Sequence, residues 1–274
     1  SPFLATSVLA ATALKKMGTD AQRQEFLPKI SGGSALFALA VDETRKHGPA
    51  KTAMSAEKHG NGFKLSGDKT FVADGHVADK IIVAARTSGA AGENDGMTLF
   101  LVDAKANGVA IERTSMVDSR NAARIKFDNV EATGDDVLGE VDGGYMALEG
   151  VLNAGRAGLA AEMSGSSQQA FSMTMSYLKE RKQFGTEIGG FQALQHRAAH
   201  LYSEIELAKS AVLKALQELD DNYGMAGPIC SLAKAKAGEV AKLASQEAVQ
   251  MHGGIGMTDE YDIGFYMKRI RVAQ

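Results

Sequence analysis

The sequence contains little of what builds disulfide frameworks, zinc sites or membrane spans. Cys230 is the single cysteine among 274 residues, which excludes an internal disulfide and any cysteine-based zinc site. No apolar run reaches the roughly 18 residues that a membrane-spanning helix needs. The first residues carry no cationic segment of the kind that opens a signal peptide. These absences predict a protein of the reducing cytoplasm with no membrane partner, in which Cys230 is a buried, inert thiol.

Charge of one sign is also scarce. The formal net charge is −3 with acidic and basic residues interspersed, so the sequence presents no basic face for nucleic acid. His196 and His200 stand one helical turn apart, but no third metal ligand accompanies them, and we expect no metal site. The chain does not begin with methionine, and we expect it to begin inside a longer protein.

Apolar periodicity divides the chain into three zones. Residues 1–33 show helical spacing, with a stop and a new N-cap at Gly18-Thr19-Asp20 and a closing Gly32-Gly33. Residues 34–138 hold seven or so short strand-like runs without an intervening helix, which predicts a β-sandwich or barrel. Residues 139–274 show long helical patterns, which predict a bundle. The expected helices of this last zone cover about 145–179, 191–219 and 229–252, and a fourth begins near 258.

Three short segments in the helical zone carry the chemistry. They are Arg181-Lys182-Gln183-Phe184-Gly185, then Gln192, then Gln250-Met251-His252-Gly253-Gly254. An arginine and amides at helix ends, with a Gly-Gly turn, can hold a diphosphate and adenosine, because anions favour exposed backbone N–H groups and glycine lets the backbone approach closely. Taken singly, each segment has a plainer explanation, such as an arginine paired with Glu180 or Glu187, or a helix C-cap at Gly253-Gly254.

Together and in this order, the segments resemble the flavin-binding half of the acyl-CoA dehydrogenase family, and the resemblance covers essentially the whole chain. It implies an α+β multidomain fold with a helical remnant (1–33), a small antiparallel β-barrel or sandwich (34–138) and a C-terminal four-helix bundle (139–274). It also implies FAD as cofactor. The residues that it assigns to the diphosphate and adenosine part of FAD are Arg181, Gln183, Phe184, Ile188, Gln192, Gln250, Gly253 and Gly254.

The resemblance places the flavin ring against a strand of the middle domain. Phe71, Val72 and Ala73 stand where the family has W-I-T/S, so a ring can still cover the flavin but the hydroxyl near its N5 is absent. Ala40 and Val41 begin the segment that replaces the family's T-E-P motif, and their backbone is expected at the flavin pyrimidine. His76, in the following turn, is a weaker candidate for contact with substrate or flavin.

The catalytic base of the family, a carboxylate, is not visible in this chain. Most members carry it in a segment that would fall just beyond Gln274, and some carry it directly before the arginine that matches Arg156, where this chain has Gly155. Arg156 itself matches an arginine near the acyl-CoA channel. The resemblance therefore implies either a dehydrogenase whose base lies outside the segment or a non-catalytic partner subunit of a heteromeric dehydrogenase. A flavin oxidase is a third alternative.

The implied partners follow from the same resemblance. They are an acyl-CoA substrate, an electron-transfer flavoprotein as electron acceptor, and either further copies of this chain in a homodimer or homotetramer or a catalytic homologue in a heteromer. Arg181 would reach the diphosphate of a flavin held by a neighbouring subunit, which requires at least a dimer.

Overall fold

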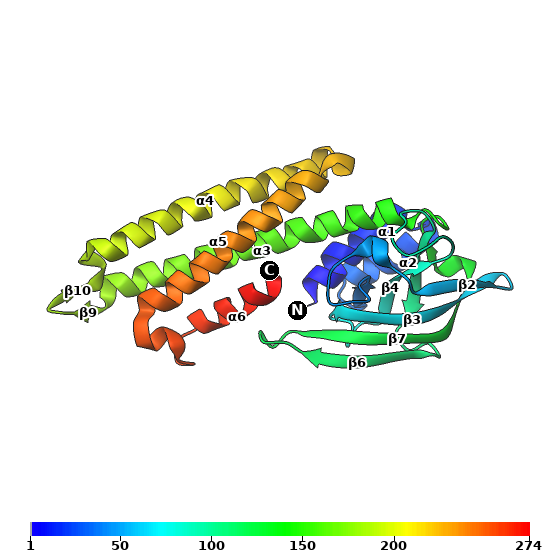
Figure 1. Ribbon diagram of the computed structural model, residues 1–274, viewed down its shortest axis with the longest axis horizontal. Helices are drawn as coiled ribbons and strands as arrows, with labels where there is room; N and C mark the ends of the chain where they lie inside the picture. The colour runs from blue at the N-terminus through cyan, green and yellow to red at the C-terminus, as the bar shows by residue number, and fades with distance from the viewer. Residues whose placement is uncertain (1) are drawn as a thin grey trace. The chain divides into compact units, whose positions relative to one another are not determined.

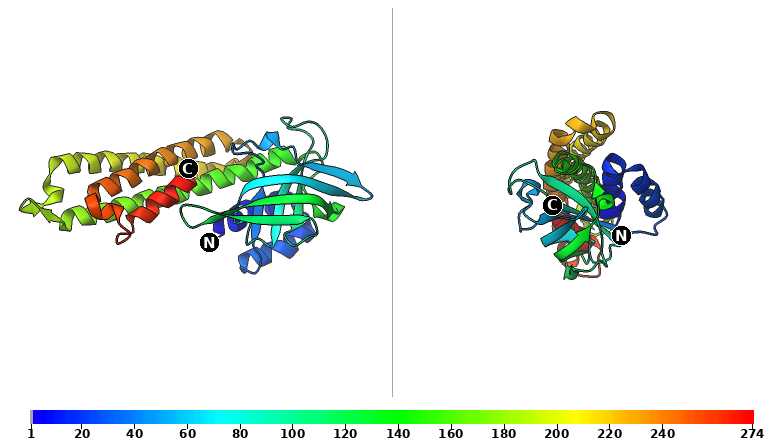
Figure 2. Two further views of the ribbon diagram at one scale, coloured as in Figure 1. Left: turned by 60° about the horizontal axis from the view of Figure 1, so that its bottom comes forward. Right: turned by 90° about the vertical axis from the view of Figure 1, so that its right-hand side faces the viewer.

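The computed structural model describes residues 2–274, and the chain divides into two compact units, Ser1–Gly155 and Arg156–Gln274. Ribbon diagrams of the chain show the helices and strands of both units (Figures 1 and 2). The sequence predicts domain boundaries after residues 33 and 138, and these two boundaries stay a prediction.

Helices and one sheet make up the first unit. Its helical segments are η1 (Leu4–Ala10, a π-helical stretch), α1 (Ala11–Met17), α2 (Asp20–Ser31), η2 (Pro49–Lys51) and η3 (Gly134–Asp136). Thr19 caps α2 as predicted: its Oγ1 accepts from the Gln22 N–H at 3.2 Å, and the Gln22 Oε1 accepts from the Thr19 N–H at 2.9 Å. The helix ends at Ser31 with Gly32 as its C-cap, and Gly33 takes a φ of +69° that glycine tolerates.

The sheet is mostly antiparallel, in the order β6-β7-β3-β2-β4-β5-β8, and β1 pairs β4 in parallel. Its strands are β1 (Phe37–Ala40), β2 (Ser55–His59), β3 (Gly62–Ala73), β4 (Lys80–Arg86), β5 (Met97–Asp103), β6 (Val109–Ser115), β7 (Asn121–Ala132) and β8 (Val137–Leu138). This matches the mixed α+β fold implied by the sequence.

Strand β4 shows why the sheet holds together. Successive side chains of a strand point to opposite faces of the sheet. Ile81 and Val83 therefore join one core cluster together with Phe100, and Ile82 joins a second cluster that includes Phe26 of α2. Both faces of β4 are therefore buried, which explains the continuous apolar run that the sequence shows there.

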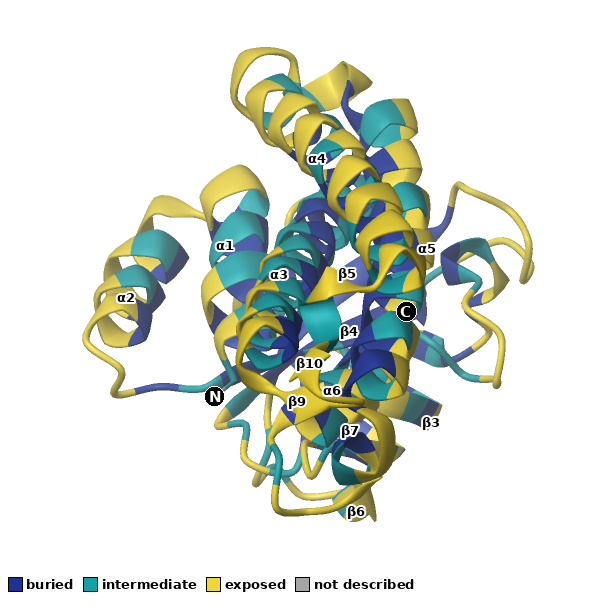
Figure 3. Cartoon of the chain, turned by 90° about the vertical axis from the view of Figure 1, so that its left-hand side faces the viewer, coloured by how far each residue is buried: buried dark blue, intermediate teal, exposed yellow. Residues whose placement is uncertain are grey.

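Long helices make up the second unit (Figure 1). Its elements are the later part of α3 (Gly144–Glu180, which begins in the first unit), β9 (Lys182–Gln183), β10 (Thr186–Glu187), η4 (Ile188–Gly190), α4 (Gln192–Asp221), η5 (Tyr223–Met225), α5 (Gly227–His252), η6 (Gly253–Met257) and α6 (Ile263–Ala273). Alanines Ala233, Ala237 and Ala241 on α5 join the core with Val212 of α4, so these helices pack closely. One side of α4 stays exposed along the helix (Figure 3).

The last helix starts later than the sequence predicts. It begins at Ile263, because Gly253–Met257 adds a 3₁₀ turn after α5. The Thr258 hydroxyl donates backward to the Ile255 carbonyl oxygen at 2.8 Å, so Thr258 closes that turn and does not cap a new helix. Cys230 is buried as expected, and burial raises the pKa of its thiol.

Candidate functional site

A strained hairpin forms one wall of a hollow in the second unit. Strands β9 and β10 pair antiparallel, and the two residues between them, Phe184 and Gly185, have φ of +56° and +80°. Positive φ at both loop positions is the mark of a type I′ turn, which glycine tolerates and phenylalanine does not favour. The Phe184 side chain is also 91% exposed and touches Phe191 with ring centroids 6.1 Å apart. Strain and exposure at one aromatic residue are typical of a binding element.

Arg181 lies at the base of this hairpin, directly after α3. Its backbone is fixed from both sides, since its N–H donates to the Tyr177 carbonyl oxygen and its carbonyl accepts from the Ile188 N–H, each at 2.9 Å. Within residues 2–274, no carboxylate lies in ion-pair distance of its guanidinium, so pairing with Glu180 or Glu187 does not occur. Glu187 lies instead 4.0 Å from the Lys182 ammonium. An exposed guanidinium on a fixed backbone, with no carboxylate partner in that range, is suited to an anionic ligand.

The C-terminal end of α5 forms the opposite wall. Gln250 is exposed, and Gly253 ends the helix with a φ of +63°. A Cβ added at Gly253 or at Gly254 would meet no atom within 4 Å, so the turn is open to a close approach. The hollow between the walls has a volume of about 520 Å³. The predicted residues that line it are Arg181, Gln183, Phe184, Ile188, Gln250, Gly253 and Gly254.

Gln192 is the one diphosphate-and-adenosine residue of the prediction that does not line the hollow. It is the first residue of α4 and is exposed to solvent. His252, which lies inside the predicted segment Gln250–Gly254, also lines the hollow. The structure further brings in residues that were not predicted, among them Tyr177, Phe191 and Arg197. Arg197 is held by an ion pair with Glu247 at 2.5 Å, so its charge is already partnered. The spacing of these residues in the sequence gives no signal, because they meet only through helix packing.

His252 is a buried group in this wall. The residue is 2% exposed and its Nδ1 lies 2.7 Å from the Ala248 carbonyl oxygen, while residues 2–274 offer its Nε2 no hydrogen-bond partner. Burial disfavours the charged imidazolium and lowers the pKa of His252.

This lowered pKa predicts a pH-dependent stability. As pH falls through about 6.5, the unfolded chain takes up a proton on this imidazole while the folded chain does not, so stability is lost with falling pH. Between the ordinary pKa of histidine and the lowered pKa of His252, the free energy of unfolding should fall by up to about 1.4 kcal/mol per pH unit. Replacing His252 with phenylalanine should remove this contribution. Urea unfolding at pH 7 and pH 5 checks this result, and equal pH slopes for variant and wild type would contradict it.

The residues predicted to face the flavin ring lie in the first unit. A register shift between Lys69 and Val72 on β3 lets the strand bulge, and Phe71 takes a φ of +52° with its side chain 58% exposed. Val72 is buried, Ala73 is half-buried, and Ala40 is buried in β1. The bulge therefore turns an aromatic ring outward directly beside the buried Val72. His76 lies nearby in the sequence, and its buried Nδ1 finds no hydrogen-bond partner in the part of the chain that the structure describes.

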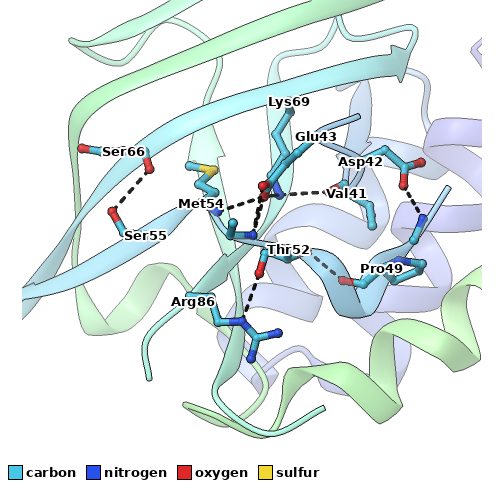
Figure 4. Close-up of polar contacts among 12 residues, drawn as sticks. Val41, Asp42, Glu43, Pro49, Thr52, Met54, Ser55, Ser66, Lys69 and Arg86 are labelled. Carbon is cyan, nitrogen blue, oxygen red and sulfur yellow. Dashed lines mark hydrogen bonds and ion pairs between the residues drawn. The ribbon is translucent and has the colours of Figure 1, made fainter. Parts of the chain in front are cut away.

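A buried ion pair fixes the backbone beside this bulge (Figure 4). The Lys69 Nζ is fully buried and lies 2.7 Å from the Glu43 carboxylate and 2.9 Å from the Val41 carbonyl oxygen. Glu43 also accepts from the Ala53 and Met54 N–H groups, each at 2.9 Å. Burial lowers the pKa of Lys69, and the neighbouring Glu43 opposes that shift. The pair joins the strand carrying Phe71 to the segment that begins at Ala40.

Two positions bear on the catalytic base that the resemblance implies. Gly155 has no room for a larger residue without movement, because a Cβ there would lie 2.6 Å from the Leu9 Cδ2. Arg156 lines a separate hollow of about 440 Å³ together with Lys234, Lys242 and Glu239. The Lys234 Nζ donates to the Gln274 carbonyl oxygen at 2.9 Å, and burial lowers the pKa of Lys234.

Neither a cluster of metal ligands nor a membrane-crossing helix is found among residues 2–274. In that range no three His, Cys, Asp or Glu side chains gather as metal ligands do. None of the helices there combines the length and the apolar character that crossing a membrane requires.

Comparisons with known proteins agree with this architecture. Residues 40–130 match the family model "Acyl-CoA dehydrogenase, middle domain", and residues 142–274 match "Acyl-CoA dehydrogenase, C-terminal domain". The chain is 32% identical over 262 residues to the short/branched chain specific acyl-CoA dehydrogenase of Bos taurus, covering 94% of the chain and 60% of that protein. A subunit of the caffeyl-CoA reductase–Etf complex of Acetobacterium woodii is 32% identical, covering 96% of the chain and 70% of the relative.

A solved structure, the butyryl-CoA dehydrogenase of Megasphaera elsdenii, superposes with a TM-score of 0.94 at 28% identity, covering 100% of this chain and 72% of that one. The chain thus spans between three fifths and three quarters of the length of these relatives.

Proposed function

The chain belongs to the acyl-CoA dehydrogenase family, and from this premise we propose that it takes part in FAD-dependent α,β-dehydrogenation of an acyl-CoA thioester. The observation that carries the proposal is the hollow in which Arg181, Gln183 and the Gly253-Gly254 turn meet, although more than 60 residues of sequence separate its two walls. Helix capping alone gives no reason for these groups to line one cavity.

The residues of the hollow fit the diphosphate and adenosine part of FAD. The unpaired Arg181 supplies the positive charge that a diphosphate needs, and the Gln183 and Gln250 amides supply further donors. The open Gly253-Gly254 turn lets a ligand reach the backbone. In the first unit, the exposed Phe71 ring offers an apolar face for a flavin ring.

Bound flavin supplies the acceptor for the hydride that leaves the acyl β-carbon. The residues of this chain would position the flavin. Phe71 to Ala73 would contact its ring, and Arg181 would bind the diphosphate of a flavin held mainly by a neighbouring copy. The site is therefore complete only in a dimer or larger assembly. An electron-transfer flavoprotein is proposed as electron acceptor, which the similarity to a subunit of an Etf complex supports.

A non-catalytic partner subunit is the second candidate function. The observation that favours it is Gly155, where other members can carry a base and where this chain packs Leu9 against the glycine. A subunit of this kind would bind FAD through Arg181 and leave proton abstraction to a catalytic homologue.

One experiment separates the two functions. The purified protein is mixed anaerobically with acyl-CoA thioesters of graded length, and flavin absorbance near 450 nm is followed. A dehydrogenase bleaches its flavin when pure, whereas a partner subunit retains FAD and bleaches only after a catalytic homologue is added. Absence of FAD, with none bound on reconstitution, would overturn both.

A further inference from the structure

One buried lysine joins the strand that carries Phe71 to the segment that leaves β1. Lys69 lies two residues before Phe71 on β3, and its side chain is fully buried. Its Nζ donates to the Val41 carbonyl oxygen at 2.9 Å and to the Glu43 carboxylate at 2.7 Å (Figure 4). Val41 directly follows Ala40, the last residue of β1. The lysine therefore holds the backbone on both sides of this contact in one arrangement.

The ladder of β3 with β7 does not by itself fix the Phe71 backbone. The register shifts between Lys69 and Val72, so that Thr70 and Phe71 together oppose a single residue of β7. The Thr70 N–H donates instead to the Asp42 carbonyl oxygen at 2.7 Å. The place of the exposed Phe71 ring therefore depends on contacts with the segment that leaves β1 as well as on the sheet.

The far side of the ion pair is anchored to the sheet. The Glu43 carboxylate accepts from the Ala53 and Met54 N–H groups, each at 2.9 Å. The Met54 carbonyl oxygen in turn accepts from the Arg86 N–H of β4 at 2.7 Å. A buried ion pair gives little stability over apolar side chains of similar volume, whereas its hydrogen bonds hold a defined geometry. The pair is therefore suited to fixing a position within the sheet.

We propose that Lys69, together with Glu43, is a positioning residue that sets the Phe71 ring and the Ala40–Val41 backbone in place for the flavin ring. The inference rests on the proposed function and refines it, because it assigns the placement of the ring contact to a residue that does not itself reach the flavin. The Lys69 Nζ is buried and already bound, so it acts through the bulge that carries Phe71. Without the pair, the Phe71 ring loses its fixed place and the flavin loses an aromatic contact.

A double-mutant cycle on the full-length protein tests this role. FAD dissociation constants are measured by flavin fluorescence for Phe71→Ala, for the paired variant Lys69→Met with Glu43→Gln, and for all three substitutions together. Each of the first two should bind FAD about tenfold more weakly than wild type, the loss expected when one aromatic contact is removed. The combined variant should lose no more than about twofold beyond that, because the pair acts through the Phe71 ring. Two independent roles would instead multiply to a loss of about a hundredfold.

The bound flavin gives a second measurement. The absorbance spectrum of its ring should change in the same way in the paired variant as in Phe71→Ala, since both remove the same contact. The matched control is Lys126→Met, which removes an exposed lysine from β7 beside β3. This control should keep the dissociation constant and the flavin spectrum of wild type.

Two results would overturn the inference directly. One is a combined variant whose loss equals the product of the two separate losses, which is what a purely structural pair predicts. The other is a Phe71→Ala variant or a paired variant that binds FAD like wild type.

Where the paired variant does not fold, Glu43→Gln alone takes its place in the cycle, since glutamine still accepts from the Ala53 and Met54 N–H groups. It should weaken FAD binding only while Phe71 is present. The same factor with and without the Phe71 ring, or no loss in either case, would contradict the inference. A wild type that binds no FAD would contradict the proposed function itself, so the two failures are distinguishable.

Discussion

Replacing Arg181 with alanine is expected to weaken FAD binding about 10- to 100-fold, because a charge-assisted contact to a diphosphate contributes about 1.5–3 kcal/mol. The guanidinium has no carboxylate partner among residues 2–274, so its removal leaves no buried charge behind. The loss should therefore appear in the ligand and not in the fold. The ratio of FAD to protein after gel filtration and the dissociation constant from flavin fluorescence measure it.

Lys182 provides a matched control for this variant. It is the next residue along, carries the same charge and lies 4.0 Å from Glu187, with a side chain 74% exposed. Lys182→Ala should retain FAD, since it does not line the hollow. Arg181→Lys should give an intermediate result, because lysine keeps the charge but loses the planar fork that grips two oxygens. Stoichiometric FAD in Arg181→Ala would count against the assignment.

Replacing Lys69 with methionine should cost about 3–5 kcal/mol of folding stability, the range found when one partner of a buried ion pair is removed. Methionine has nearly the same length, so packing is largely kept and the loss comes from Glu43. That carboxylate is 18% exposed and would lose its countercharge, although the Ala53 and Met54 N–H groups still bind it. The free energy of unfolding in urea measures the effect.

The paired variant Lys69→Met with Glu43→Gln sharpens this prediction. Removing both charges should recover much of the lost stability, because no uncompensated carboxylate remains. Lys126→Met on the neighbouring strand β7 is the control, since Lys126 is exposed and should change stability by less than about 0.5 kcal/mol. A Lys69→Met variant within about 1 kcal/mol of wild type would show that the pair does not hold the segment beside Phe71.

Local signals in the sequence predict most of the elements, and the family resemblance names most of the predicted residues that line the hollow. Thr19 caps α2 as its sequence context predicts, and Arg181 and Gly253 stand at helix ends where their exposure follows from the pattern. Long-range pairing was not predictable. Neither the meeting of Lys69 with Glu43 nor the stacking of Tyr261 on His252 leaves a periodic trace, because each depends on how separate elements pack.

Backbone geometry accounts for the remaining differences. The left-handed φ of Phe71 and Phe184 goes against the preference of phenylalanine, so no local rule predicts it. The late start of α6 at Ile263 follows from a side-chain hydrogen bond of Thr258, a residue whose type favours capping as readily as closing a turn. Gln192 begins α4 as expected but lies outside the lining of the hollow, since a position in sequence does not fix the direction of a side chain.

The most direct test of the central claim is a crystal structure of the protein with FAD bound. The account predicts both phosphates of the ligand within ion-pair distance of the Arg181 guanidinium of one copy, with the flavin ring against Phe71 of another. Phosphates bound away from Arg181, with the hollow beside Gly253 left empty, would contradict it.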